Sequence, residues 1–369
     1  MAMTRAIKQW AKGLEETSSE DTVNDISKHL GKSYTIYGTM LILPPTLFDS
    51  KQWKFILDQG NEATQRLFDC IAQHLKISHI ACTKPIPLQD DTQQIENVIR
   101  SPKNFTLLYG DFGPDECSYP PSAEDFNAAY WVTAKQNGIA QTWAPRWTMF
   151  SRGNISEKQR VLELPSVKAA VNEGEKSSAG CAAVDLYAGI GYFTFSYLKA
   201  GFSKVLCWDL NPWSTEGLRR GTAANKWQSI LSDEGVDLNN MARSNARCLI
   251  FNESNIHAAA KINTMRADLP PIRHVNCGLL PTSKDSWDVA FTVLDPILGG
   301  WIHVHENFDQ REIETKGEEV RAEFQRKLED TPGGKEKQVL LEYINRVKTY
   351  APGIYHVVLD IYIPPRQAP

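Results

Sequence analysis

The chain has 369 residues, of which 42% are hydrophobic and 23% charged, and its formal net charge is −4. These values are ordinary for a globular protein of about two domains. No apolar run approaches the length of a membrane span, and the N-terminus lacks the apolar core of a secretion signal, which excludes the membrane and secreted classes. The net charge disfavours a surface that binds polyanions as a whole, although it permits a local basic patch.

Seven cysteines are scattered along the chain, and none stands in CxxC spacing. Such a set is typical of reduced, buried thiols in a cytosolic protein and predicts neither a disulfide framework nor a metal site. The basic start of the chain soon gives way to acidic residues, which a transit peptide would avoid. We therefore expect a cytoplasmic protein without a bound metal.

The first part of the chain predicts a small α+β module. Residues 34–43 form two short apolar runs that bend at Gly38, and residues 51–74 have the periodicity of helices. Strand-like and turn-rich segments follow. We expect an N-terminal extension over residues 1–30 and the α+β module over residues 31–150.

From residue 151 the pattern alternates between helix and strand. Residues 156–164 predict a helix in which Ser156 and Gln159 fit a capping box. Strands are expected at 182–187, 204–209, 247–251, 272–277 and 300–305. This alternation predicts an α/β domain over residues 151–369 with a mostly parallel, doubly wound sheet.

The end of the chain predicts three further pieces. A charged segment over about 309–337 is expected to be a solvated insertion in the α/β domain. Residues 338–350 predict a helix, and a Pro-Gly break separates it from a final strand at 354–363.

The most informative stretch is residues 181–213. An apolar strand ends at Asp185, and Gly189 and Gly191 mark a tight turn after it. A helix-like segment follows, and a second strand ends at Asp209. Glycine lets the backbone take positive φ and approach a ligand, and an acidic side chain at the second strand end can accept both hydroxyls of a ribose. The stretch therefore predicts a βαβ unit that binds a nucleotide-like ligand.

Details of the turn distinguish between ligands. Gly189 and Gly191 match the first two glycines of the dinucleotide fingerprint, but Thr194 occupies the third position. The missing third glycine and the leading Asp185 favour S-adenosylmethionine (AdoMet), which has no pyrophosphate for the turn to bind.

Six further segments are distinctive: MFSRGNISEKQRV, VDLYAGIGYFTFSYLKAG, LNPWSTEGLRRGTAANKW, HVNCGLLPTS, GGWIHVHEN and VKTYAPGIYHVVLD. With a weaker match in IYGTMLILPP, they resemble the tRNA wybutosine-synthesising protein 2 family, in particular its fungal members. That family is close to the tRNA guanine methyltransferases of archaea and eukaryotes.

The resemblance implies a class I AdoMet fold, Rossmann-like, joined to a smaller N-terminal module that binds the tRNA substrate. It also implies transfer of the 3-amino-3-carboxypropyl group of AdoMet to carbon 7 of 4-demethylwyosine, with release of methylthioadenosine. The implied partner is phenylalanine tRNA, in which this base lies next to the anticodon. Neither a membrane nor a protein partner is implied.

The resemblance also implies site residues. It places Ser151 and Lys158 on ligand-binding positions before the sheet, and Asp209 on the ribose position. It implies that Glu253 and Ser254 contact the adenine end of the ligand, and Asn255 could take the place of Ser254. Many relatives have glutamate where Asp209 stands, so its reach is one methylene shorter. The AdoMet-binding residues predicted in all are Ser151, Arg152, Lys158, Asp185, Ala188, Gly189, Gly191, Asp209, Glu253, Ser254 and Asn276.

The orientation of the ligand decides which group is transferred, because a nucleophile attacks whichever carbon beside the sulfonium lies in line with it. An enzyme that moves the amino-acid side must hold the ligand's carboxylate with cationic or N–H donors. Arg152, Lys158 and the glycine turn are the candidates for this role.

A general base would help to remove the proton from the attacked ring carbon. Asp185, Asn276 and His305 are the candidate catalytic residues, and none is assigned. His303 and His305 point to the same side of a strand, but two ligands without a third do not make a metal site.

Basic residues near aromatic ones predict contacts to an unpaired anticodon-loop base and to phosphates. The same residues would suit an exposed helix face without an RNA partner. The candidates are Arg219, Arg220, Lys226 and Trp227, together with Arg146, Trp147 and Arg152.

Two alternatives stay open. The first is methyl transfer to a guanine of tRNA by the same fold. The second is a catalytically silent protein that only binds tRNA, against which the intact glycine turn and its two flanking aspartates argue.

Overall fold

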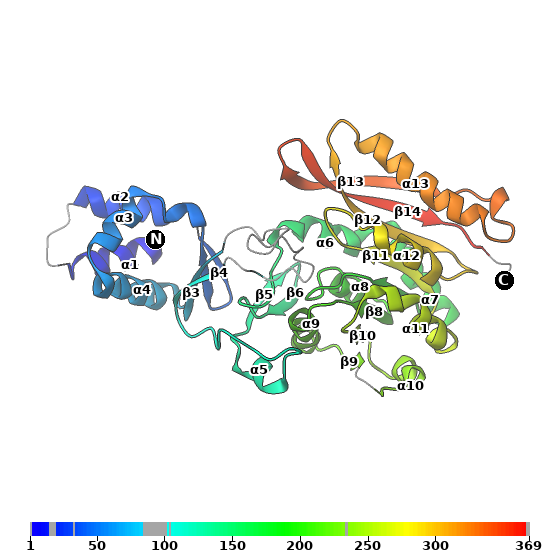
Figure 1. Cartoon of the computed structure of the whole chain (residues 1–369), viewed down its shortest axis with the longest axis horizontal. Helices are drawn as coiled ribbons and strands as arrows, with labels where there is room; N and C mark the ends of the chain where they lie inside the picture. Colours follow the sequence, from blue (N-terminus) through cyan, green and yellow to red (C-terminus); the bar gives the residue numbers. More distant parts are fainter. Residues whose placement is uncertain are drawn as a thin grey trace. The chain divides into compact units, whose positions relative to one another are not determined.

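The computed structural model describes residues 2–14, 20–31, 34–83, 102, 105–232 and 235–366. The chain divides into two compact units (Figure 1). One comprises Met1–Ala134 and Trp143–Met149, and the other comprises Lys135–Thr142 and Phe150–Pro369.

The first unit packs helices against a four-stranded sheet of order β1-β2-β3-β4. Strands β1 and β2 form the predicted antiparallel pair around Gly38, β2 and β3 run parallel, and β3 and β4 run antiparallel. Buried side chains of α1 to α4 and of β2 and β3 form one core. The elements are α1 (Ala2–Ala11), α2 (Glu20–Leu30), β1 (Thr35–Tyr37), β2 (Met40–Leu43), η1 (Pro45–Leu47), α3 (Lys51–Asp58), α4 (Asn61–Leu75), β3 (His79–Thr83), β4 (Phe105–Tyr109) and α5 (Ala123–Ala128).

A hairpin of β5 (Val132–Gln136) and β6 (Ile139–Trp143) follows, and its tip belongs to the second unit. Asn225 binds this tip with both ends of its amide: it accepts from Ala140 N at 2.9 Å and donates to Ala140 O at 2.6 Å. The hairpin tip is thereby fixed to the residue that ends the helix over Pro212–Ala224.

The second unit is built on an eight-stranded sheet of order β13-β14-β12-β11-β7-β8-β10-β9. The six strands from β12 to β9 run parallel, whereas β14 and β13 run antiparallel to their neighbours. The five predicted strands are all present, and the predicted doubly wound sheet is confirmed. The strands are β7 (Ala182–Asp185), β8 (Lys204–Trp208), β9 (Ser229–Ser232), β10 (Cys248–Phe251), β11 (Ile272–Cys277), β12 (Gly300–Asp309), β13 (Leu340–Ala351) and β14 (Ile354–Ile363).

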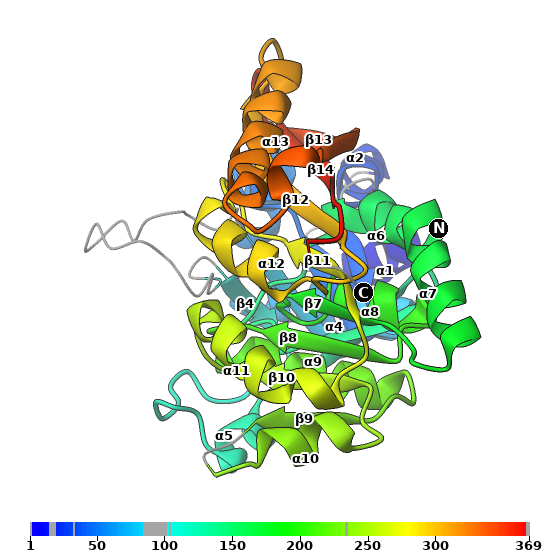
Figure 2. The ribbon, with the colours of Figure 1, turned by 90° about the vertical axis from the view of Figure 1, so that its right-hand side faces the viewer.

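Helices cover both faces of this sheet, because its central strands are buried on both sides (Figure 2). Side chains of β7, β8 and β10 alternate between two cores, one toward α6 to α9 and the other toward α10 to α13. The helices are α6 (Ile155–Glu163), α7 (Pro165–Ser177), α8 (Thr194–Ala200), α9 (Pro212–Ala224), α10 (Leu238–Arg243), α11 (Ala258–Met265), α12 (Trp287–Val293) and α13 (Ile313–Glu329), with 3₁₀ turns η2 (Arg152–Asn154), η3 (Asn255–His257), η4 (Arg266–Asp268), η5 (Lys284–Ser286) and η6 (Gly334–Glu336).

Two local predictions are wrong. The chain enters α6 through η2, so Ser156 already lies inside the first turn of the helix. The expected capping box is therefore absent. The N-cap residue is Asn154, whose side chain makes no capping hydrogen bond. The helix expected at 338–350 is strand β13, which pairs with β14 across the Pro-Gly turn. Three register shifts along β13 interrupt its two-residue alternation, and the apolar residues thus acquire a spacing that imitates a helix.

The charged segment after β12 contains α13, whose apolar side is part of the core. Val320, Phe324 and Leu328 are buried, and the small Gly317 lets Leu341 and Ile344 of β13 pack closely against the helix. Charged residues occupy the opposite side of the helix. Within the described part of the chain, no helix has the length and hydrophobicity that a membrane span requires.

Phe324→Ala should lower the free energy of unfolding by about 3–5 kcal/mol, because it leaves a cavity in the core under α13. Thr315→Ala, on the exposed side of the same helix, should change it by less than about 0.5 kcal/mol. Urea denaturation of both variants checks this. Equal, small effects would mean that α13 does not contribute to the core.

Candidate functional site

The buried carboxylate of Asp185 joins three elements at the carboxyl end of β7. It accepts hydrogen bonds from Thr194 N at 3.0 Å, from Thr194 Oγ1 at 2.8 Å and from Asn276 Nδ2 at 3.1 Å. Burial raises the pKa of Asp185, while these donors oppose the shift. Asp185 thus fixes the start of α8 and the end of β11, which favours a structural role over proton transfer.

The glycine turn follows Asp185. Ala188 is buried and its N–H donates to Trp208 O at 2.9 Å, which ties the turn to the end of β8. Gly189 and Gly191 have φ values of 54° and 90°, in the left-handed region. A β-carbon on Gly191 would lie 2.7 Å from the ring of Phe195, so both the conformation and the space require glycine.

Asp209 stands beside this turn at the end of β8. Its carboxylate accepts from Gly189 N at 2.8 Å and from Asn211 N at 2.9 Å, and the side chain keeps partial exposure. Burial raises the pKa of Asp209 to about 6. The sequence therefore placed an acidic group correctly at the turn, where ribose hydroxyls can reach it.

The loop after β10 carries the predicted adenine-end residues. Glu253 accepts from Trp208 Nε1 at 3.2 Å and from Lys261 Nζ at 2.8 Å. Ser254 caps η3, whereas Asn255 donates to Leu186 O at 2.9 Å, at the end of β7. Of the two alternatives, the Asn255 side chain is the one that contacts the central strand.

Lys158 of α6 is the buried cation of the site. Its ammonium donates to Gln136 Oε1 at 2.7 Å and to Gln141 Oε1 at 2.9 Å, both on the hairpin tip. It lies 5.1 Å from the ring centre of Phe150 and 5.3 Å from that of Tyr192, which belongs to the glycine turn. Burial, helped by the charge of a second lysine, lowers the pKa of Lys158 to about 7.

The segment before α6 approaches the same turn. Ser151 N donates to Tyr192 Oη at 3.2 Å, and Arg152 lies exposed in η2. Ser151, Lys158 and the glycine turn are therefore brought together, while the Arg152 side chain faces solvent.

An ion-pair network fixes α6 on the sheet. Arg160 donates to Glu157 and, at 2.5 and 3.0 Å, to Asp360 of β14, which also pairs with His303 at 2.7 Å. These partners hold the pKa of Asp360 far below its ordinary value. Sequence patterns did not indicate this network or the two hairpin glutamines, because its members are far apart in the chain.

Asn276 and His305 both have a buried polar atom without a partner among the described residues. In Asn276 it is Oδ1, since Nδ2 binds Asp185; in His305 it is Nε2, since Nδ1 bonds His356 Nε2 at 3.0 Å. Burial lowers the pKa of both histidines to about 3, so they are neutral. No group of three metal-ligating side chains occurs in the described ranges.

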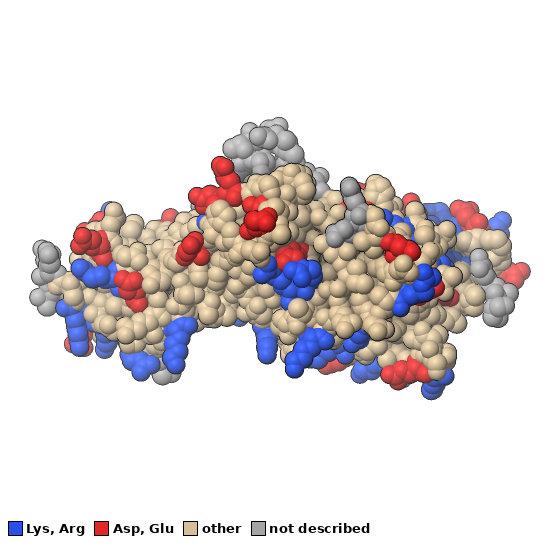
Figure 3. All heavy atoms as spheres, turned by 90° about the horizontal axis from the view of Figure 1, so that it is seen from below, with Lys and Arg blue, Asp and Glu red and all other residues tan. Residues whose placement is uncertain are grey.

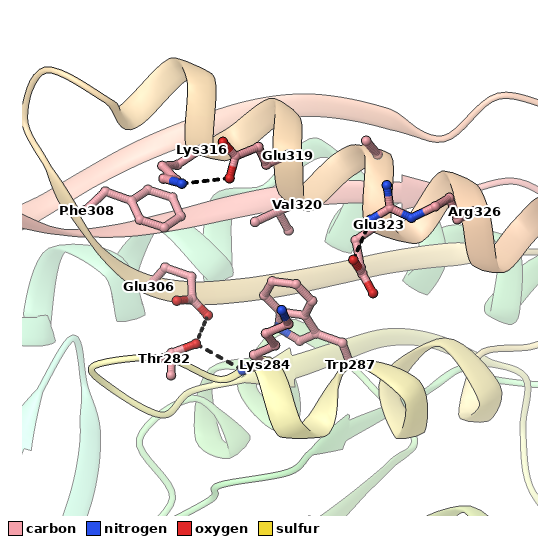
Figure 4. Close-up of a pocket in the computed structure, with 11 residues that line it drawn as sticks. Thr282, Lys284, Trp287, Glu306, Phe308, Lys316, Glu319, Val320, Glu323 and Arg326 are labelled. Atoms are coloured by element: carbon pink, nitrogen blue, oxygen red, sulfur yellow. Dashed lines mark hydrogen bonds and ion pairs between the residues drawn. The ribbon is translucent and has the colours of Figure 1, made fainter.

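On the opposite face of β12, a cavity of about 360 Å³ lies between that strand, α13 and the loop after β11 (Figure 4). Glu306 projects into this region and accepts from Thr282 Oγ1 at 2.9 Å and Ser283 N at 2.8 Å. Burial raises the pKa of Glu306. Its carboxylate fixes the loop that follows Asn276.

The predicted RNA contacts are mostly engaged within the protein. Arg219 and Arg220 both pair with Glu216, and Arg146 pairs with Asp115. Lys226 follows the C-cap of α9 and has positive φ, and Trp227 packs against Phe195. On the face in Figure 3, Lys and Arg side chains lie in separate groups with Asp and Glu between them.

The chain is similar to two fungal proteins named tRNA wybutosine-synthesizing protein 2. It is 38% identical to that of Schizosaccharomyces pombe over 342 residues, which cover 92% of this chain and 74% of that protein. The Saccharomyces cerevisiae protein is 34% identical over 310 residues, which cover 77% of this chain and 60% of that protein, less than two thirds of its length. No family model matches the chain.

Solved structures share the fold at low identity. Pyrococcus horikoshii TYW2 in complex with MeSAdo is 18% identical with a TM-score of 0.58, covering 96% of this chain and 98% of that one. The complex of aTrm5 and tRNALeu is 17% identical with a TM-score of 0.53, covering 95% and 81%. The predicted class I AdoMet-dependent transferase fold, with a smaller N-terminal module, is confirmed.

Asp185→Ala should lower the free energy of unfolding by about 3 kcal/mol, because it leaves buried donors on Thr194 and Asn276 without an acceptor. Asp209→Ala, which removes a partly exposed carboxylate, should cost less than about 1 kcal/mol. Chemical denaturation compares the two. A stable Asp185→Ala protein without activity would instead assign Asp185 a catalytic role.

Proposed function

Because the chain belongs to the tRNA wybutosine-synthesizing protein 2 family, we propose that its substrate is 4-demethylwyosine next to the anticodon of phenylalanine tRNA. The chain is an AdoMet-dependent tRNA aminocarboxypropyltransferase of wybutosine synthesis, as the resemblance implied. The accepting atom is carbon 7 of the tricyclic base, and the nucleoside product is methylthioadenosine. A cytoplasmic location accords with the seven free cysteines.

Lys158 is the observation that carries the assignment of the site. Its ammonium is buried beside the glycine turn, and no described carboxylate lies within ion-pair distance of it. A buried ammonium needs a partner that replaces its lost hydration. The carboxylate of the aminocarboxypropyl group is such a partner, so the residues present fit AdoMet.

The other residues complete the fit. Asp209, beside the glycine turn, would accept from the ribose hydroxyls, and Glu253 with Ser254 or Asn255 would contact the adenine end. Oδ1 of Asn276, buried without a partner in the described chain, is available to accept from a ligand. Because Asp209 and Lys158 hold opposite ends, the γ-carbon between them is fixed in place.

When bound, AdoMet supplies a carbon made electrophilic by the adjacent sulfonium. Carbon 7 of the base bonds to the γ-carbon as the bond from that carbon to sulfur breaks, and methylthioadenosine leaves as a neutral thioether. The proton of carbon 7 is then lost to a base or to water. Lys158 contributes orientation, since holding the carboxylate turns the γ-carbon rather than the methyl group toward the base.

The guanine methyltransferase alternative requires the methyl group of AdoMet to face the base. A buried cation on the amino-acid side of AdoMet does not by itself explain that orientation. The binding-only alternative gives no reason for a glycine turn with positive φ and a carboxylate at its edge. Both alternatives predict different products from the proposed function.

The test is mass spectrometry of the nucleoside by-product after incubation with AdoMet and phenylalanine tRNA carrying 4-demethylwyosine. We expect methylthioadenosine and an aminocarboxypropyl mass on the tRNA. The same tRNA with unmodified guanosine is the control and should give no product. S-Adenosylhomocysteine would support the methyltransferase alternative, and no product with either tRNA would support the binding-only one.

The affinity for methylthioadenosine should fall as the pH is lowered through about 6, because protonation of Asp209 removes the ribose acceptor. The sign follows from its raised pKa: the carboxylate is present above pH 6 and lost below it. This ligand has no carboxylate, so the titration of Lys158 does not enter. Calorimetry should also show that Asp209→Ala binds about 1.5–3 kcal/mol more weakly at neutral pH. An Asp209→Ala protein that keeps the full pH dependence would remove Asp209 from the site.

A further inference from the structure

A second lysine lies beside Lys158. Lys348 of β13 pairs in register with His356 of β14, and its side chain runs along Gly153. A β-carbon on Gly153 would lie 2.7 Å from Lys348 Nζ and 3.1 Å from its Cδ. Gly153 belongs to η2, directly before the helix that carries Lys158. Burial and, after it, the positive charge of Lys348 lower the pKa of Lys158.

The nearby carboxylates do not neutralise this pair. Glu157 and Asp360 are both buried and accept hydrogen bonds from Arg160. Each accepts a further hydrogen bond, Glu157 from Asn345 and Asp360 from His303. Within the ranges that the structure describes, neither Lys158 nor Lys348 takes part in an ion pair. Burial also lowers the pKa of Lys348. Two adjacent, partly desolvated ammonium groups without a counter-charge favour the binding of an anion.

Polar atoms without partners lie on the strands and the 3₁₀ turn next to Lys348. Both side-chain polar atoms of Asn307, Oδ1 of Asn154 and Nδ1 of His356 are buried and have no hydrogen-bond partner in the described chain. Asn307 pairs in register with His356, which pairs with Lys348, and Asn154 follows Gly153 in η2. Buried polar atoms are rarely left unbonded, so this group indicates a polar ligand.

The donors and acceptors match a zwitterion. The lysines offer N–H donors and positive charge to a carboxylate, and the amide oxygens of Asn307 and Asn154 can accept from a protonated amine. A fully ionised phosphate would accept from the lysines and from Nδ2 of Asn307, but it has no donor for the amide oxygens of Asn307 and Asn154. The geometry therefore favours an amino-acid group over a tRNA phosphate.

We propose that Lys348 and Lys158 together bind the α-carboxylate of the aminocarboxypropyl group of AdoMet, and that Asn307 and Asn154 accept from its α-ammonium. This inference rests on the proposed function and adds residues of the C-terminal strands to amino-acid recognition. Because the group is held at both its charges, its γ-carbon is turned toward the RNA base.

The test compares the binding of AdoMet with that of its decarboxylated analogue, which lacks only the carboxylate. Calorimetry on the full chain should show that Lys348→Met weakens AdoMet binding about tenfold, the usual effect of losing one hydrogen bond to a charged group, and leaves the analogue unchanged. Gly153→Ala should act in the same direction by displacing the Lys348 ammonium, and it retains the lysine itself. Lys168→Met, on the exposed side of α7, is the matched control and should bind both ligands normally.

The outcomes distinguish a failure of the proposed function from a failure of the inference about Lys348. A wild-type chain that binds neither ligand would contradict the proposed function. A wild-type chain that prefers AdoMet, with the same preference in Lys348→Met and Gly153→Ala, would overturn only the inference about Lys348. Weaker tRNA binding by Lys348→Met with normal AdoMet affinity would overturn it in favour of a phosphate contact.

Discussion

The site depends on one buried carboxylate. Asp185 ends the central strand and binds the start of α8 on one side and the end of β11 on the other. The glycine turn between β7 and α8 takes its shape from that fixed point, and Asp209 closes against the turn from β8. A carboxylate at a helix start is also favoured by the helix dipole, which offsets part of the cost of burying the charge. The nucleotide half of the site is thus preorganised by the sheet itself.

The charges of the second unit are compensated unequally. The buried carboxylates Asp185, Glu157 and Asp360 each have several donors, whereas the ammonium groups of Lys158 and Lys348 lack a carboxylate in the described structure. Neutral amide oxygens and aromatic rings surround Lys158 instead. Such an uncompensated pair destabilises the fold and is typical of a site that awaits an anionic ligand. The region around Lys158 and Lys348 therefore lacks a counter-charge, whereas the Asp185 carboxylate at the glycine turn is well supplied with hydrogen-bond donors.

Local patterns predicted the sheet and the glycine turn well. Strands β7, β8 and β10 have near-continuous apolar runs, and Asp185, Gly189 and Asp209 lie at or just after the ends of such runs, where a parallel sheet gathers its ligand residues. The helix expected at 338–350 failed because register shifts in β13 imitate helical spacing. The same helix prediction gives no indication that Lys348 lies beside Gly153. The hydrogen bonds of Lys158 to Gln136 and Gln141 could not be predicted either, because local periodicity does not indicate that a hairpin tip belongs to the second unit.

The central claim is that the buried Lys158 holds the amino-acid side of AdoMet, so that the aminocarboxypropyl group faces the RNA base. A crystal structure of the chain with AdoMet bound tests it most directly, through the position of the ligand's carboxylate. The account predicts hydrogen-bond distances from that carboxylate to Nζ of Lys158 and from the ribose hydroxyls to Asp209. A carboxylate that points into solvent, with the methyl group turned toward the open side of the site, would contradict it.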